Sequence, residues 1–186
     1  MTGFWVFGYG SLMWDPGFEF AERRLARLDG FHRAFCLRSV HYRGTAAAPG
    51  LVLGLDAAEG AACTGVVYRV PAASAWDTLV YLRRRELVSY AYHETRATVQ
   101  LAGGGRVGAL AYVVDPLHAQ YCGRLTLEDQ AQIIARAEGL RGPNRDYLWN
   151  TVEHLAELGI CDDDLAWLAA RVRALAQLTN GSVTTS

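Results

Sequence analysis

The stretch from Phe7 to Trp14, FGYGSLMW, combines two glycines, a hydroxyl and large apolar side chains directly after the apolar residues 4–7. Glycine has no Cβ, so its backbone can adopt a positive φ and a ligand can approach it closely. A loop at the end of a strand can also direct several backbone N–H groups towards one anion. The pattern therefore indicates either a carboxylate-binding loop or a tight turn with close backbone packing.

Two familiar glycine motifs do not fit this stretch. The third glycine of a dinucleotide fingerprint and the second glycine of a nucleophile elbow would both fall at Met13. The expected elements also do not alternate as strand and helix, as a Rossmann fold would require. The stretch is predicted to be neither a cofactor clamp nor the holder of a nucleophilic Ser11.

Glu86 is the acidic residue best suited to proton transfer. It falls at the end of an expected helix, next to Leu87 and Val88, which suggests burial. Desolvation and the negative end of a helix dipole both raise the pKa of a carboxyl, whereas nearby arginines lower it. A carboxyl that titrates near neutral pH can serve as base and acid, contributing ~10²–10⁴-fold in rate. The alternative is an ion pair with a nearby arginine such as Arg83. The arginines at 83–85 are interpreted as a solvated face.

Strands are expected in the first two thirds of the chain, where apolar runs alternate with turn residues. The expected strands are residues 4–7, two short strands within 25–40 that turn at Asp29-Gly30, residues 51–55 paired with 63–70, and a hairpin of 95–101 with 107–114. One helix interrupts them. Its predicted capping box joins Ser74 and Asp77, and its apolar stripe includes Trp76.

Three helices are expected after Asp115-Pro116. The first has a capping box of Thr126 and Asp129 and ends at Gly139, the second covers residues 144–158 with Asn144 interpreted as its cap, and the third covers residues 162–178. No repeat or linker separates these helices from the strands. A single domain over residues 1–178 with a flexible tail at 179–186 is therefore predicted.

Composition excludes several classes of function. The net charge of −1 argues against nucleic acid as a partner. The four cysteines and five histidines are scattered without the spacing of a zinc site, so free thiols in a reducing cytoplasm are expected. The N-terminus lacks the basic region of a signal peptide, and no apolar run is long enough to cross a bilayer, so membrane insertion is not expected.

Several motifs in order give the chain a family resemblance. They are Tyr9-Gly10-Ser11-Leu12, Arg43-Gly44-Thr45, the stretch 81–86, Tyr121 with Gly123, and residues 142–148. The chain resembles the γ-glutamylcyclotransferases, and among them it is most similar to the ChaC-like, glutathione-specific branch. The resemblance covers nearly the whole chain. Ala46-Ala47-Ala48 and His93-Glu94 depart from the family pattern and are expected to affect only the rim of the pocket.

The resemblance implies an α+β fold, a small mixed β-barrel with a C-terminal set of helices packed on it, and no metal or organic cofactor. It implies a small-molecule substrate, glutathione, which is cleaved into 5-oxoproline and cysteinylglycine. Glu86 then becomes the catalytic acid/base. The loop that holds the γ-glutamyl group is formed by Tyr9, Gly10, Ser11 and Leu12.

This chemistry suits the residues. A γ-glutamyl amide carries its own nucleophile, the α-amine, so the protein must hold the curled conformer and move protons. Backbone N–H groups of residues 10–12 are expected to bind the α-carboxylate, the oxyanion, or both. Arg43 is either an anchor for a substrate carboxylate or a surface ion pair. Tyr92 and Tyr121 either bind substrate or are ordinary core-edge residues.

Two alternatives stay open at this stage. The same reaction can act on other γ-glutamyl amines or dipeptides. A non-catalytic binding or regulatory module can use the same scaffold, although such a module has little need for an acid at position 86.

Overall fold

The computed structural model describes residues 2–181, which form two compact units. The first comprises the chain up to Ala34 together with Leu53–Tyr121, and the second comprises Phe35–Val52 and the chain from Cys122 onward. Two long strands, β2 (Glu22–Ser39) and β3 (Gly50–Val70), contribute to both units. None of the helices within the described residues is long and apolar enough to span a membrane.

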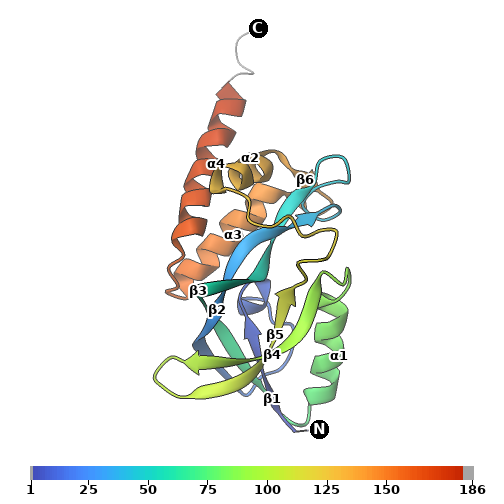
Figure 1. Ribbon diagram of the computed structural model, residues 1–186, viewed down its shortest axis with the longest axis vertical. Coiled ribbons are helices and arrows are strands. Elements are labelled where there is room, and N and C mark those ends of the chain that lie inside the picture. The colour runs from blue at the N-terminus through green and yellow to red at the C-terminus, as the bar shows by residue number, and fades with distance from the viewer. Residues whose placement is uncertain (1, 182–186) are drawn as a thin grey trace. The chain divides into compact units, whose positions relative to one another are not determined.

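A closed five-stranded barrel is the main feature of the fold (Figure 1). The strand order is β1-β3-β2-β4-β5, with β1 at Phe4–Gly8, β4 at Tyr92–Leu101 and β5 at Arg106–Val114. β1 is antiparallel to β3 but parallel to β5, so the barrel is mixed. The predicted mixed β-barrel with helices is thereby confirmed, as is the hairpin of β4 and β5.

The prediction of four short strands in place of β2 and β3 was wrong. Gly30 and Gly60 have positive φ, +81° and +76°, but each lies inside a continuous strand and does not form a hairpin turn. A positive-φ glycine within a strand is typical of a bulge, which bends the strand without ending it. Barrel closure requires such bending, and the local pattern of residues does not distinguish a bend from a reversal.

Helix α1 (Ala75–Glu86) packs through one face on the outside of the barrel. Consecutive residues of β1 point to opposite faces of the sheet. Phe7 accordingly joins one core cluster with Leu55 and Val67, whereas Val6 joins a second with Leu79 and Leu82 of α1. This second cluster positions the last turn of α1 and therefore Glu86.

Two details of α1 contradict the sequence predictions. Ser74 is the N-cap residue, but its side chain caps no backbone N–H, so the capping box with Asp77 is not formed. Trp76 is 64% exposed and does not belong to the buried stripe. The buried positions are Ala75, Thr78, Leu79 and Leu82.

The second unit contains helices α2 (Leu127–Arg136), α3 (Asn144–Glu157) and α4 (Asp163–Gly181). Thr126 caps α2 as predicted, because its hydroxyl accepts the N–H of Asp129. The predicted end of α2 at Gly139 was wrong, since Ala137 is already extended. Gly139 belongs to the two-residue strand β6 (Glu138–Gly139), which pairs with β7 (Gly142–Pro143).

Helix α4 continues to Gly181, beyond the expected start of the tail, and residues 182–186 lie outside the described part. The single domain stays a prediction.

Candidate active site

The loop after β1 folds into a single 3₁₀ turn. Ser11–Met13 forms this turn, η1, with the N–H of Met13 bonded to the carbonyl of Gly10 at 2.8 Å. The N–H groups of Ser11 and Leu12 precede that bond, so neither has an acceptor within the turn. Leu12 and Met13 are buried and anchor the turn to the protein. The turn is therefore anchored through Leu12 and Met13, and its own hydrogen bond does not use the N–H groups of Ser11 and Leu12.

Backbone carbonyls on both sides of η1 are held by side chains of the barrel. Arg33, which is only 7% exposed, donates to the carbonyl of Tyr9 at 3.0 Å and to that of Thr64. The hydroxyl of Tyr68 donates to the carbonyl of Met13 at 2.6 Å. The ring of Tyr9 is itself buried in the barrel core. These contacts fix the shape of the turn before any ligand binds.

Glu86 is the last residue of α1 and its side chain is only 17% exposed. Its Oε1 lies 3.1 Å from Nε of Arg85. Burial raises the pKa of the carboxyl above its ordinary value, and the neighbouring Arg85 opposes this only in part. The predicted burial and direction of the shift are confirmed. The alternative, an ion pair with a nearby arginine, is also present, but its partner is Arg85. Arg83, the arginine named as an example, instead binds Glu94 through two bonds of 2.7 and 2.8 Å.

Arg85 connects Glu86 to the turn. Its Nη2 donates to Oγ of Ser11 at 3.0 Å, and its Nη1 donates to the carbonyl of Asp15 at 2.7 Å and to the hydroxyl of Tyr81 at 2.9 Å. The interpretation of residues 83–85 as a solvated face was therefore wrong for Arg85, whose side chain is 20% exposed. The structure thus brings Ser11 and Glu86 together around one guanidinium.

Tyr112 is a further ionisable residue near Glu86 and Glu94. It is almost fully buried on β5, and its hydroxyl lies 3.4 Å from Oε2 of Glu94. Burial, the charge of Glu94 and the charge of Glu86 all raise the pKa of the phenol. Tyr112 therefore stays protonated. The hydrogen bonds from Arg83 lower the pKa of Glu94.

The remaining predicted site residues have partners within the protein. The hydroxyl of Tyr92 donates to the carbonyl of Leu53 at 2.9 Å, and that of Tyr121 donates to Oδ2 of Asp56 at 3.0 Å. Arg43 belongs to the second unit, where its guanidinium donates to the carbonyls of Arg141 and Pro143 and lies over the Tyr147 ring. Burial lowers the pKa of Arg43.

Asn144 does not cap its helix, as had been expected, because the N-cap residue is Pro143. The Asn144 side chain is fully buried, and it exchanges two hydrogen bonds with the backbone of Leu51.

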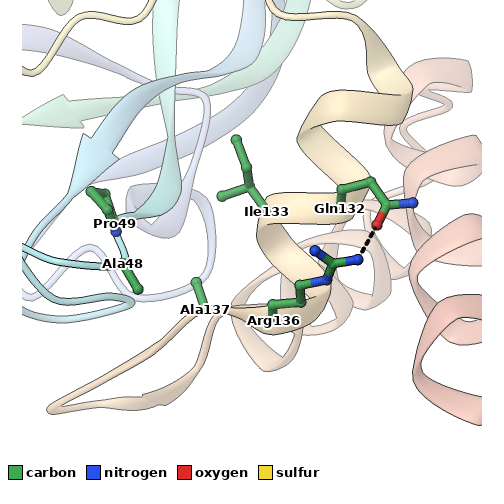
Figure 2. A pocket seen from close by; sticks show the side chains of 6 residues that line it. All are labelled: Ala48, Pro49, Gln132, Ile133, Arg136 and Ala137. Carbon is green, nitrogen blue, oxygen red and sulfur yellow. Dashed lines mark hydrogen bonds between the residues drawn. The ribbon is translucent and has the colours of Figure 1, made fainter. Parts of the chain in front are cut away.

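A pocket of about 230 Å³ in the second unit has a different character (Figure 2). Its lining consists of Ala48, Pro49, Gln132, Ile133, Arg136 and Ala137. Arg136 is bonded to Gln132 at 3.0 Å, and the lining includes no carboxyl group. This pocket lacks a group suited to proton transfer and is separate from the Glu86 site.

Comparison with known proteins identifies the family. A family model described as ChaC-like protein matches residues 4–175. The chain belongs to the ChaC-like family. A curated relative, the glutathione-specific gamma-glutamylcyclotransferase of Escherichia coli (strain K12), is 41% identical over 171 residues, which cover 92% of this chain and 73% of the relative. Gamma-glutamylcyclotransferase 2-3 of Arabidopsis thaliana is 37% identical over 175 residues, covering 91% and 88%.

A solved structure agrees with this assignment. The crystal structure of a yeast gamma-glutamyl cyclotransferase specific to glutathione matches with a TM-score of 0.82 and 26% identity, covering 94% of this chain and 100% of that one. The family predicted from the sequence motifs is confirmed.

Sequence reasoning about this ChaC-like chain missed three side chains of the site. Arg85 follows Tyr81 by four residues, a spacing that places both on one helix face and offered a signal. Tyr112 is the polar ring of an otherwise apolar strand, and Arg33 is a charge inside an apolar run. For both, an unexpected polar residue among buried neighbours was the available sign.

Proposed function

We propose that this ChaC-like protein is a glutathione-specific γ-glutamylcyclotransferase, which converts glutathione into 5-oxoproline and cysteinylglycine. The relatives named for this activity match nearly the whole chain. The observation that carries the proposal is a buried carboxyl, Glu86, with a raised pKa, joined through Arg85 to the turn at Ser11. This arrangement suits a reaction that needs proton transfer and substrate positioning but no protein nucleophile.

The proposed reaction is an intramolecular acyl transfer. In its ionised form, Glu86 accepts a proton from the α-ammonium of the γ-glutamyl group. The freed amine attacks the γ-carbonyl carbon and forms a tetrahedral intermediate. The bond from that carbon to the cysteine nitrogen then breaks as Glu86 gives its proton to the departing nitrogen. Glu86 takes up the second proton of the attacking nitrogen and passes it to the departing amine, which leaves as an ammonium. The lactam 5-oxoproline and a dipeptide amine result, with no net change in the enzyme.

The turn is proposed to hold the γ-glutamyl group. The N–H groups of Ser11 and Leu12 are suitable donors to the α-carboxylate, to the oxyanion, or to both. Gly10, which precedes them, leaves space for a close approach. Holding amine and carbonyl in attack geometry can supply up to ~7–11 kcal/mol in ideal intramolecular cases.

Contacts of the substrate with Tyr9, Arg43, Tyr92 and Tyr121 also remain proposals. Arg43 already donates to two backbone carbonyls, and the hydroxyls of Tyr92 and Tyr121 already donate within the protein. A direct role for any of them therefore requires that a substrate contact be added to these bonds or replace them. Titration of glutathione into Arg43→Gln and Tyr121→Phe variants tests these contacts, and an affinity equal to that of the wild type removes the residue from the substrate site.

The activity is tested by incubating purified protein with glutathione and a panel of γ-glutamyl amines and dipeptides, with 5-oxoproline detected by mass. Preferential product from glutathione supports the proposal. Product mainly from other compounds identifies a cyclotransferase of different preference. No product from any compound favours a binding module.

The acid/base assignment is tested with Glu86→Gln. We expect this variant to fold and to lose at least ~10²-fold in kcat, because an amide cannot carry the proton. Glu59→Gln makes the same chemical change at an exposed position and serves as the control. Turnover of Glu86→Gln equal to that of the control would show that another group moves the proton.

We also propose that the protein works in the cytoplasm. None of the four cysteines, all of which lie within residues 2–181, forms a disulfide, and two of them are buried, which is typical of proteins in a reducing compartment. The proposed substrate is itself a thiol that such a compartment keeps reduced.

A further inference from the structure

Arg85 uses each of its guanidinium nitrogens on a different partner. Nε faces the Glu86 carboxylate, Nη2 binds the Ser11 hydroxyl, and Nη1 binds the carbonyl of Asp15. The Tyr81 hydroxyl, one helical turn earlier, also accepts from Nη1 and fixes the long side chain. The planar fork of an arginine makes such a set of contacts possible, and an ammonium group cannot reproduce it.

Its neighbours in the sequence are arranged differently. Arg83 is committed to Glu94 on the adjacent strand. Arg84 is exposed and, within residues 2–181, has no hydrogen bond or ion pair described for its side chain. Of the three consecutive arginines, Arg85 is the one that contacts both halves of the candidate active site.

We propose that Arg85 is a positioning residue that couples the Glu86 carboxylate to the substrate-binding turn, holding the proton acceptor and the Ser11–Asp15 segment in one fixed relation. This inference rests on the proposed function, because it assigns Arg85 a task within that reaction. The reaction requires the α-amine to lie between its proton acceptor and the γ-carbonyl. One group that fixes both the carboxylate and the turn sets that distance.

The bond to Ser11 also orients a hydroxyl. Oγ accepts a hydrogen bond from Arg85, so the Ser11 O–H proton is left to donate to another acceptor. The Ser11 hydroxyl thereby becomes a second donor beside its own N–H. Loss of Arg85 releases this hydroxyl to rotate, even if the backbone of the turn stays in place.

Arg85 also adjusts the charge of the site. The ionisable groups that act on Glu86 are Arg85 on its own helix and Tyr112 on β5, which stays protonated. Glu94 on β4 is neutralised by Arg83, and η1 contributes only the uncharged Ser11. Arg85 is therefore the positive charge that favours the ionised form of Glu86 against the effect of burial.

The first test needs no turnover. The titration of the Glu86 carboxyl is followed by ¹³C NMR of labelled glutamate in wild type, Arg85→Met, Arg85→Lys and the control Arg84→Met, with Glu86→Gln to assign the signal. We expect the midpoint to move to higher pH in Arg85→Met, to move less in Arg85→Lys, and to stay unchanged in Arg84→Met. Hydrogen exchange of the amides at residues 11–15 should accelerate in both Arg85 variants but not in the control.

The second test measures kinetics with glutathione. We expect kcat/KM to fall on the order of 10²-fold in Arg85→Met, with the acid limb of its pH profile at higher pH than in the wild type. Compared with Arg85→Met, Arg85→Lys should bring the acid limb of the pH profile closer to that of the wild type, because lysine keeps the positive charge. It should not restore kcat/KM, because lysine lacks the planar guanidinium. The kcat/KM of Arg84→Met should stay within about twofold of that of the wild type.

Ser11→Ala should lower kcat/KM without moving the acid limb of the pH profile. The double variant Arg85→Met/Ser11→Ala should show less than additive losses of kcat/KM.

The two tests distinguish a failure of the proposed function from a failure of the positioning role of Arg85. If wild type and Arg84→Met release no 5-oxoproline, the proposed function fails, while the NMR titration and exchange still report whether Arg85 holds the carboxyl and the turn. If Arg85→Met or Arg85→Lys folds with an unchanged Glu86 midpoint and unchanged amide exchange, the coupling role is wrong. Retention of kcat/KM within twofold of Arg84→Met in both Arg85 variants would overturn it equally.

Discussion

Glu86 combines burial with only partial compensation of its charge. An ionised carboxylate loses hydration when it is buried, and a single ion pair rarely restores that loss. Arg85 supplies one such pair, yet the pKa of Glu86 remains raised. A group kept in this condition suits proton transfer near neutral pH but weakens the folded state in which it is ionised.

This cost predicts that Glu86→Gln stabilises the protein at high pH. Because the folded state holds the Glu86 proton to higher pH than the unfolded chain, the wild type is most stable below the unfolded pKa and loses that contribution as pH rises through the folded pKa. The neutral amide avoids the loss. We expect a higher Tm for Glu86→Gln at pH 8 and little difference near pH 4, measured by circular dichroism; each kcal/mol corresponds to roughly 2–4 °C in a protein of this size.

Glu59→Gln is the control for this measurement, because an exposed glutamate has no desolvation to relieve. A lower Tm for Glu86→Gln at pH 8 would mean that the pair with Arg85 outweighs the cost of burial.

The sequence identified Glu86 but not its partner. Its position at a helix end beside apolar residues, together with the family motif, singled out Glu86 as the candidate acid. The choice between Arg83 and Arg85 depends on which side of the last helical turn faces β4 and which faces the turn at Ser11. That information lies in the packing of α1 on the barrel, which local residue patterns do not contain.

At the scale of elements, the two predicted capping boxes differ in outcome. The Thr126 hydroxyl accepts the N–H of Asp129 and donates to its carboxylate at 2.6 Å. The Ser74 hydroxyl is buried and has no hydrogen-bond partner within the described chain. The same sequence pattern therefore forms a side-chain N-cap on α2 and none on α1.

These two caps predict opposite responses to alanine. Thr126→Ala should destabilise the protein by about 1 kcal/mol, since it removes a working N-cap. Ser74→Ala should be neutral or slightly stabilising, because it removes a buried hydroxyl that lacks a partner. Urea unfolding of both variants measures the difference. Equal losses of stability would indicate that Ser74 caps α1 in solution.

Local signals predicted the hairpin of β4 and β5 correctly and the long strands β2 and β3 incorrectly. The hairpin of β4 and β5 is closed by residues 103–105, three glycines that all adopt positive φ. Adjacent residues therefore determine this turn. The continuity of β2 and β3 depends instead on distant partners. Val66–Val70 of β3 pairs with β1, far away in the sequence. Non-local pairing of this kind turned two apparent hairpin turns into bends within strands.

At the scale of the whole molecule, each unit is assembled from segments that are distant in the sequence. In the second unit, Asn144 links two such segments by hydrogen bonds. Its side-chain amide accepts the N–H of Leu51 at 2.7 Å and donates to the carbonyl of Leu51 at 2.8 Å, across 93 positions. The side chain thus acts as a strand partner at the start of β3. A Cβ at Gly50 would lie 2.7 Å from Asn144 Oδ1, so glycine is required there.

The sequence assigned Asn144 to a helix cap because asparagine before a helix usually caps it. Nothing near position 144 in the sequence indicates a bond to Leu51. The family motif at residues 142–148 marked the region, whereas its structural role became visible only with the fold.

The two bonds between Asn144 and Leu51 predict that Asn144→Ala destabilises the protein by about 2–6 kcal/mol. The substitution leaves the buried N–H and carbonyl of Leu51 without partners, and each such group costs about 1–3 kcal/mol. Arg145→Ala, the next position of the same helix, should change stability by less than about 1 kcal/mol. Urea unfolding measures both. Because Asn144 belongs to the second unit and Glu86 to the first, an Asn144→Ala variant that remains folded should have the same Glu86 midpoint as the wild type in the NMR titration. A shifted midpoint would mean that the bonds between Asn144 and Leu51 also influence the Glu86 carboxyl.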